Sequence, residues 1–181
     1  MGIGEWLGVI AIALGIIVLP TALQMFCGRP KIEFEFSVVG DKKNSALQCK
    51  ILNRPIESKF LTWLGVRREN AHIFAAYRVE NTDTGEIVVD LMQPIIVSKG
   101  RRGKEFELTS SFLGVSIAIA WISEQGVYAL EEEIDKKAIP LKSGIYSVPL
   151  MVFCGEKSFP VRRNFVVTSN PIDTYWASIS S

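Results

Sequence analysis

The longest apolar stretch of the chain lies near its beginning and holds no charged residue between Glu5 and Arg29. As a helix rising about 1.5 Å per residue, positions 6–26 would span about 31 Å, close to the roughly 30 Å of a bilayer's hydrocarbon core. We therefore expect one transmembrane helix over residues 6–27, preceded by a short tail over residues 1–5. A cleaved signal peptide would instead show basic residues before the apolar run and a small-x-small site after it.

Small residues recur along one face of this expected helix at steps of three, four or seven. Such residues let a second helix approach closely, and this packing drives the association of helices in lipid. The sequence thus predicts a partner transmembrane helix, from a second copy or from another protein. The alternative is that Gly and Ala are simply common in membrane helices. The residues of this face are Gly4, Gly8, Ala11, Gly15 and Ala22.

The charges beside the apolar run predict which side of the membrane the rest of the chain occupies. Arg29 and Lys31 follow the run directly, whereas the amino-terminal flank contains only Glu5. Because basic flanks tend to stay in the cytoplasm, we expect the domain to face the cytoplasm. The bias is only two charges, so a signal-anchored receptor-like or adhesion-like domain on the other side is the alternative.

From residue 31 onward the pattern changes to the two-residue alternation of half-buried strands. Pairs of alternating segments flank turn-like residues, and residues 104–123 are strand-like without showing whether they form one strand or two. We expect an all-β antiparallel sandwich of about 7–9 strands over residues 31–169, followed by a tail over residues 170–181. The expected strand pairs are 31–38 with 47–51, 71–80 with 86–97, and 145–154 with 159–168.

Between residues 53 and 70 apolar residues fall at helical spacing, which predicts a short amphipathic helix over about residues 55–64. If successive strands alternate in direction, this connection and the basic loop at 99–104 both lie at the membrane-proximal end of the sandwich. The helix would either bury Trp63 on the core as a lid or rest in the lipid headgroup layer. Anionic lipid would attract the arginines of these connections, and the alternative is that they are ordinary solvated turn charges. The residues expected to contact lipid or a partner are Phe60, Trp63, Arg67, Arg68, Arg101 and Arg102.

One short motif near the carboxyl-terminal end, Leu141-x-x-Gly144-x-Tyr146, precedes the expected penultimate strand. It resembles the tyrosine corner of immunoglobulin-like sandwiches, in which the hydroxyl bonds back to the preceding loop. With the order of strands over residues 31–169, it gives a fold-level resemblance to immunoglobulin-like and fibronectin-III-like sandwiches. An antibody-type core is not expected, because Val148 stands where the second cysteine of that core would fall.

The charge balance and the cysteines limit the functions to consider. A net charge of +1 is unlike that of a nucleic-acid binder, which usually carries a strong basic excess. The chain has three cysteines, Cys27, Cys49 and Cys154, and an odd number so far apart does not suit a disulfide framework. Cys49 is expected to be a small core residue.

The sequence contains no motif of a catalytic or metal site. His72, the only histidine, is expected to be a strand residue on the face opposite Tyr77 rather than a general base. Glutamates 131–133 lack the spaced oxygen ligands of a calcium loop. We therefore expect no enzyme activity and no cofactor or metal.

Taken together, these features predict a single-pass membrane-anchored, non-catalytic interaction or accessory module. Its expected partners are membrane lipid, a partner transmembrane helix and a protein that the sandwich recruits or braces. An accessory subunit of a membrane enzyme complex, with the chemistry in its partner, is the remaining alternative.

Overall fold

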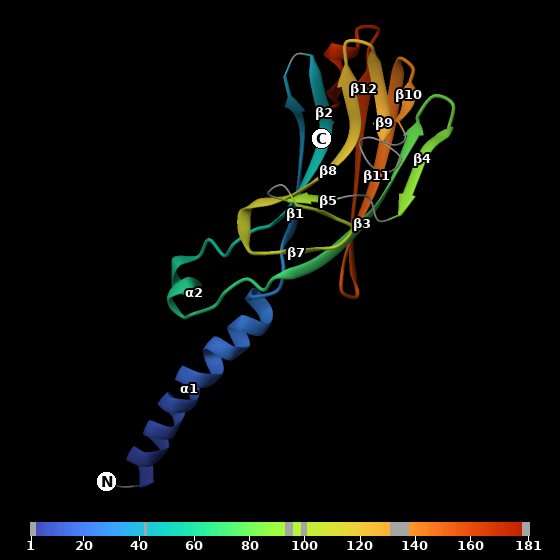
Figure 1. Ribbon diagram of the computed structural model, residues 1–181. Helices are drawn as coiled ribbons and strands as arrows, with labels where there is room; N and C mark the ends of the chain where they lie inside the picture. The colour runs from blue at the N-terminus through green and yellow to red at the C-terminus, as the bar shows by residue number, and fades with distance from the viewer. Residues whose placement is uncertain (1–2, 42, 93–95, 99–100, 131–137, 179–181) are drawn as a thin grey trace.

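A computed structural model of the chain describes residues 3–41, 43–92, 96–98, 101–130 and 138–178. For some of these residues, chiefly within 3–17, it describes the backbone but not the side chain. A long helix, α1 (Ile3–Cys27), projects from a β-rich body (Figure 1). It covers the helix expected over residues 6–27 and contains Pro20. Among the described residues, no helix has both the length and the apolar character needed to cross a membrane.

The β-rich body consists of two antiparallel sheets, which is consistent with the expected all-β sandwich. The first sheet has the order β1 (Ile32–Gly40), β2 (Asn44–Asn53), β8 (Ser111–Ser123), β5 (Ile96–Ser98), β6 (Arg101–Gly103), with β9 (Gly126–Leu130) beside β8 and β10 (Ala138–Leu141) beside β9. The second has the order β13 (Tyr175–Trp176), β12 (Lys157–Val167), β11 (Gly144–Cys154), β3 (Ala71–Asn81), β4 (Ile87–Met92), with β7 (Phe106–Leu108) beside β3.

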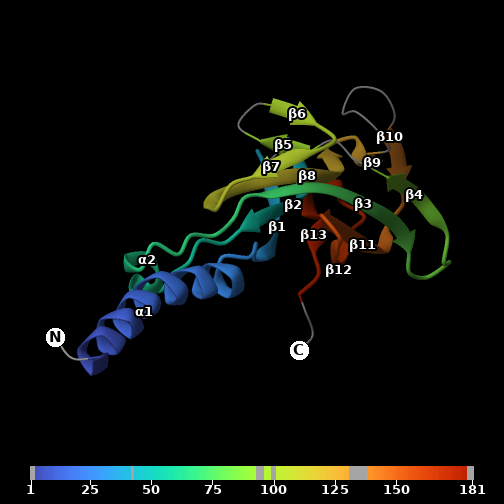
Figure 2. The same ribbon diagram turned by 90° about the horizontal axis from the view of Figure 1, so that it is seen from below.

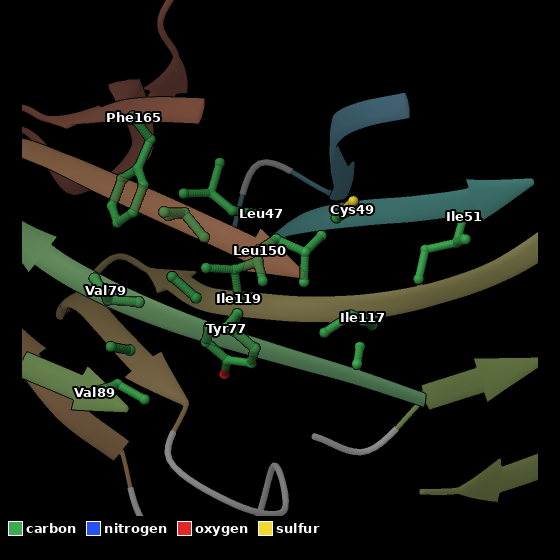
Figure 3. Close-up of a cluster of buried hydrophobic side chains, with 14 of the residues drawn as sticks. Leu47, Cys49, Ile51, Tyr77, Val79, Val89, Ile117, Ile119, Leu150 and Phe165 are labelled. Carbon is green, nitrogen blue, oxygen red and sulfur yellow. The ribbon is translucent and has the colours of Figure 1, made fainter. Parts of the chain in front are cut away.

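The core lies between the two sheets and is built from alternate residues of their strands. Leu47 and Cys49 of β2 belong to the same buried cluster as Tyr77 of β3 and Leu150 of β11 (Figure 3). Cys49 is fully buried, and burial raises the pKa of its thiol to about 12. The thiol therefore stays protonated, as expected for a small core residue. All three cysteines of the chain are unpaired.

The chain changes sheets within two segments, which corrects one expected strand and decides an alternative that the sequence left open. The segment 86–97 is not one strand, since β4 ends at Met92 in the second sheet and β5 begins at Ile96 in the first. Likewise, β7 and β8 divide residues 104–123 into two strands in different sheets. Alternation along the chain reports which residues face inward, but it does not report which sheet they belong to.

The tyrosine-corner hydrogen bond predicted from the sequence is present. The Tyr146 hydroxyl donates to the Lys142 carbonyl oxygen at 2.9 Å, and the buried Tyr146 ring stacks on Phe165 with centroids 5.3 Å apart. His72 is exposed on β3, on the face opposite the buried Tyr77, as expected. The tail expected over residues 170–181 contains a 3₁₀ turn (Pro171–Asp173) and the short strand β13, which pairs with β12.

Candidate functional site

The carboxyl-terminal part of α1 is fastened to the sandwich by the side-chain amide of Gln24. Its Nε2 donates to the Arg67 carbonyl oxygen at 2.8 Å, and its Oε1 accepts from the Arg67 backbone N–H at 2.9 Å. The amide thus satisfies both main-chain groups of one residue, as a neighbouring strand would. We call the contacts between residues 24–31 and residues 53–54 and 66–69 the helix junction.

Arg68 completes the end of α1 within the helix junction. Its Nη1 donates to the carbonyl oxygens of Cys27 at 2.6 Å and Arg29 at 2.7 Å, and its Nε donates to that of Arg54 at 3.1 Å. The last carbonyl groups of a helix lack partners inside the helix, and a cation is favourable at that end of the helix dipole. The Arg68 side chain is therefore a bracing group, a role that the sequence analysis missed because its partners lie 14, 39 and 41 residues away.

Asn53 ties the helix junction to both sheets from a fully buried position at the end of β2. Its Oδ1 accepts from the Lys31 backbone N–H at 3.0 Å, and its Nδ2 donates to the carbonyl oxygens of Glu69 at 2.7 Å and Leu108 at 3.4 Å. The Glu69 backbone N–H in turn donates to the Gly28 carbonyl oxygen at 2.7 Å. A buried amide with three main-chain partners holds these segments in one arrangement.

Charged side chains on β1 reinforce the same region. Arg54 forms ion pairs with Glu33 at 2.7 Å and Glu35 at 2.6 Å, and Lys31 pairs with Glu33 at 2.8 Å. Hydrogen bonds from Lys31 and then from Arg54 lower the pKa of the Glu33 carboxyl below its ordinary value. The negative charge of Glu33 is therefore already neutralised within the chain.

The helix expected over residues 55–64 is shorter, because α2 covers only Lys59–Trp63. Ser58 caps its start by accepting from the Leu61 backbone N–H at 3.4 Å, and Gly65 follows it with a φ of +80°, a backbone conformation that favours glycine. Phe60 and Trp63 are 61% and 78% exposed, with their rings stacked at 6.3 Å. The interpretation of α2 as a lid that buries Trp63 on the core is therefore wrong.

Figures 1 and 2 both place α2 beside α1, at the end of the sandwich from which the helix projects. Of the basic loop expected at the same end, residues 99–100 lie outside the described residues, and residues 101–103 form β6, which with β5 is on the part of the first sheet away from α1 (Figure 2). The expectation failed because β4 and β5 belong to different sheets, so the count of alternating strand directions does not apply. Arg101 and Arg102 belong to β6, and their side chains lie outside the described residues.

The small-residue face of α1 is partly described. Gly8 and Gly15 are exposed, and a Cβ built on either would meet no atom within 4 Å outside its own helix. Ala22 is half-buried, whereas the side-chain positions of Gly4 and Ala11 lie outside the described residues. The described part of this face has room for a second helix.

Within the described parts of the chain, no group of three or more His, Cys, Asp or Glu residues is placed to hold a metal ion. The comparisons with known proteins add no identity, since no family model, no curated protein and no solved structure matches the chain. The helix junction and the exposed aromatic residues of α2 are therefore the features from which a function can be argued.

Proposed function

We propose that this chain is a single-pass membrane-anchored, non-catalytic interaction module, in which α1 lies in the bilayer and α2 rests in the headgroup layer beside it. The observation that carries the proposal is the helix junction, which holds an exposed aromatic pair next to an apolar helix. The support for α1 in lipid is the absence of charge between Glu5 and Arg29 and the exposure of large apolar side chains along the helix. These side chains include Ile12, Val18, Leu19, Met25 and Phe26.

The chemistry of α2 suits the interface of a membrane. Tryptophan is enriched where apolar lipid meets water, and interfacial helices bury an apolar face about 5–10 Å into the boundary of headgroups and acyl chains. Phe60 and Trp63 supply that face, and the exposed Lys59 and Arg67 lie close to them in the chain. Each basic residue near an anionic leaflet contributes about 1 kcal/mol of attraction.

We infer an immunoglobulin-like topology for the sandwich from its strand order. The order β1-β2-β8-β5 corresponds to A-B-E-D of a constant-type immunoglobulin domain, and β3-β11-β12 corresponds to C-F-G. The tyrosine-corner bond of Tyr146 supports the same assignment. Such sandwiches host many functions, so the fold supports an interaction role without naming its partner.

Lipid contact by α2 is tested with the full chain in bilayers that contain brominated lipids, which quench nearby tryptophan. Replacing Trp63 by Phe should remove a large part of the quenched fluorescence. The matched Trp121→Phe variant changes a half-buried residue of β8 and should leave the quenched part unchanged. If Trp63→Phe also left the quenched part of the fluorescence unchanged, α2 would not touch lipid.

The side of the membrane is a separate part of the proposal, and Arg29 and Lys31 favour the cytoplasm. Protease access to the carboxyl-terminal tail at Ser181 in sealed vesicles of known orientation tests it. A tail protected in intact cells supports the cytoplasmic position. A digested tail would favour a receptor-like or adhesion-like domain outside the cytoplasm.

A further inference from the structure

The sandwich is open along the side where β1 and β12 face each other. Within the described residues β1 pairs only with β2, and β12 is bordered on its outer edge by the two-residue strand β13. A groove of about 740 Å³ lies between the two strands. Its apolar and basic lining includes Ile32, Phe34 and Phe36 of β1 and Val161, Arg162 and Arg163 of β12.

The chain itself shows how an extended segment closes one part of this opening. β13 pairs with β12 through Phe165 and Val166. The Trp176 ring inserts between the sheets, with its centroid 4.9 Å from that of Phe36 and 5.7 Å from that of Phe165. Its Nε1–H also donates to the Ser37 carbonyl oxygen at 3.0 Å. One side chain of an added strand thus bridges both sheets.

The neighbouring part of the groove is not closed in this way. The Ala177 backbone N–H donates to the Asn164 carbonyl oxygen at 2.8 Å, which extends the pairing by one residue beyond β13. Because alternate residues of a strand face the same side, Ser178 follows Trp176 as the next residue on the groove side. A serine is too small and polar to cover Phe34 and Val161, which remain partly exposed.

The charges of the groove favour an acidic occupant. The Arg163 guanidinium lies 5.4 Å from the centroid of the Phe36 ring, and no described carboxylate forms an ion pair with it. Arg162, the preceding residue of β12, faces the other side of the sheet, where its guanidinium lies 3.6 Å from Glu80. On the opposite wall, the charge of Glu33 is already neutralised by its basic neighbours. A carboxylate entering the groove beside Phe36 would therefore meet the Arg163 guanidinium, with which it can form charge-assisted hydrogen bonds.

We propose that this groove binds an extended acidic segment of a partner protein, which adds to the outer edge of β12 next to β13 and places an apolar side chain between Phe34 and Val161. In strand addition, main-chain hydrogen bonds supply affinity and pockets for alternate side chains supply specificity. Pro160 has no N–H, so it limits how far a segment pairs along this edge. The segment is therefore short, and one apolar and one acidic residue dominate its recognition.

The proposal deepens the interaction role proposed above, but it does not depend on membrane insertion. The test uses the full chain in detergent micelles and the fluorescein-labelled octapeptide Ser-Val-Ser-Asp-Ser-Val-Ser-Asp, in which Val and Asp share one face of the strand, with binding followed by fluorescence polarisation. We expect saturable binding that Arg163→Gln weakens about tenfold, which corresponds to roughly 1.4 kcal/mol. Lys157→Gln changes a basic residue of the same strand outside the groove and should leave binding unchanged.

The backbone contribution has its own control. A peptide methylated on alternate backbone nitrogens keeps its side chains and charge but loses the donors that pair with a strand edge, so it should bind at least about tenfold more weakly. Hydrogen exchange of the Arg162 amide, measured with and without the unmodified peptide, should be slower when the peptide is bound. Equal binding of the methylated peptide would overturn the proposal.

Residues that follow Trp176 could compete for the groove, so the assay is repeated with a chain that ends there. Absence of saturable binding in both chains overturns the proposal, and so does equal weakening by Lys157→Gln and Arg163→Gln. Light scattering checks for a dimer of the chain. If a dimer is present and Trp176→Ala dissociates it, the groove binds a second copy, and the proposal of an acidic partner segment is overturned. Because micelles replace the bilayer, failure of α1 to insert into membranes leaves this outcome unaffected.

Discussion

The helix junction predicts that a single amide side chain controls how firmly α1 is held on the sandwich. In Gln24→Leu the side-chain volume is nearly kept, while both hydrogen bonds to the Arg67 main chain are lost. At about 0.5–1 kcal/mol for each exposed neutral bond, opening of the junction should become easier by about 1–2 kcal/mol. The sandwich should keep its overall stability, because its core does not involve Gln24.

The reporter for this opening is the Glu69 backbone amide, which donates to the Gly28 carbonyl oxygen and is untouched by the substitution. A change of 1–2 kcal/mol should speed its hydrogen exchange by roughly 5- to 30-fold in the full chain. Gln125→Leu, at an exposed turn between β8 and β9, is the matched control and should leave Glu69 unaffected. Unchanged protection of Glu69 in Gln24→Leu would refute the view that the Gln24 bonds open together with the rest of the junction.

Three further predictions concern the helix face, the tyrosine corner and pH. Gly8→Leu with Gly15→Leu should weaken association of α1 in membranes, measured by crosslinking against an Ile12→Leu control; unchanged crosslinking contradicts a packing role. Tyr146→Phe should lower the free energy of unfolding in urea by about 0.5–1.5 kcal/mol, and an unchanged midpoint would show that the bond to Lys142 adds nothing. The lowered pKa of Glu33 means that its ionised form stabilises the fold above its ordinary pKa, and that this contribution is lost as pH falls through the lowered value. Glu33→Gln should therefore flatten the decline in stability between roughly pH 6 and pH 3, whereas an equally steep decline would exclude this carboxyl as a cause.

Local patterns predicted the parts of the fold that depend on neighbours in the chain. The strands at 71–81 and 144–154, the hairpin that joins 144–154 to 157–167 and the bond of Tyr146 follow from alternation and short motifs, although the hairpin turn is two residues shorter than expected. The inward position of Cys49 followed from the same alternation. Each of these features is decided within about ten residues.

Features that depend on distant pairing were not predicted correctly. The change of sheet after Met92 depends on whether β3 or β8 offers the next free edge, and nothing near residue 92 indicates this. For the same reason, the bracing role of Arg68 was invisible, since the carbonyl groups that it binds belong to residues 27, 29 and 54. Exposure of Trp63 was left open between two interpretations, because a helix of five residues has too little pattern to show which face is buried.

The direct passage from α1 into β1 has a mechanical consequence. Tension applied through α1 reaches β1, whose nine residues from Ile32 to Gly40 all pair with β2 in one uninterrupted register. A pull along this strand loads its hydrogen bonds together in shear, whereas a pull across the sheet would break them one after another. The bonds of Gln24 and Arg68 pass part of the same load to the segment that leads into β3, so both sheets share it. The domain is thus built to resist being drawn away from α1.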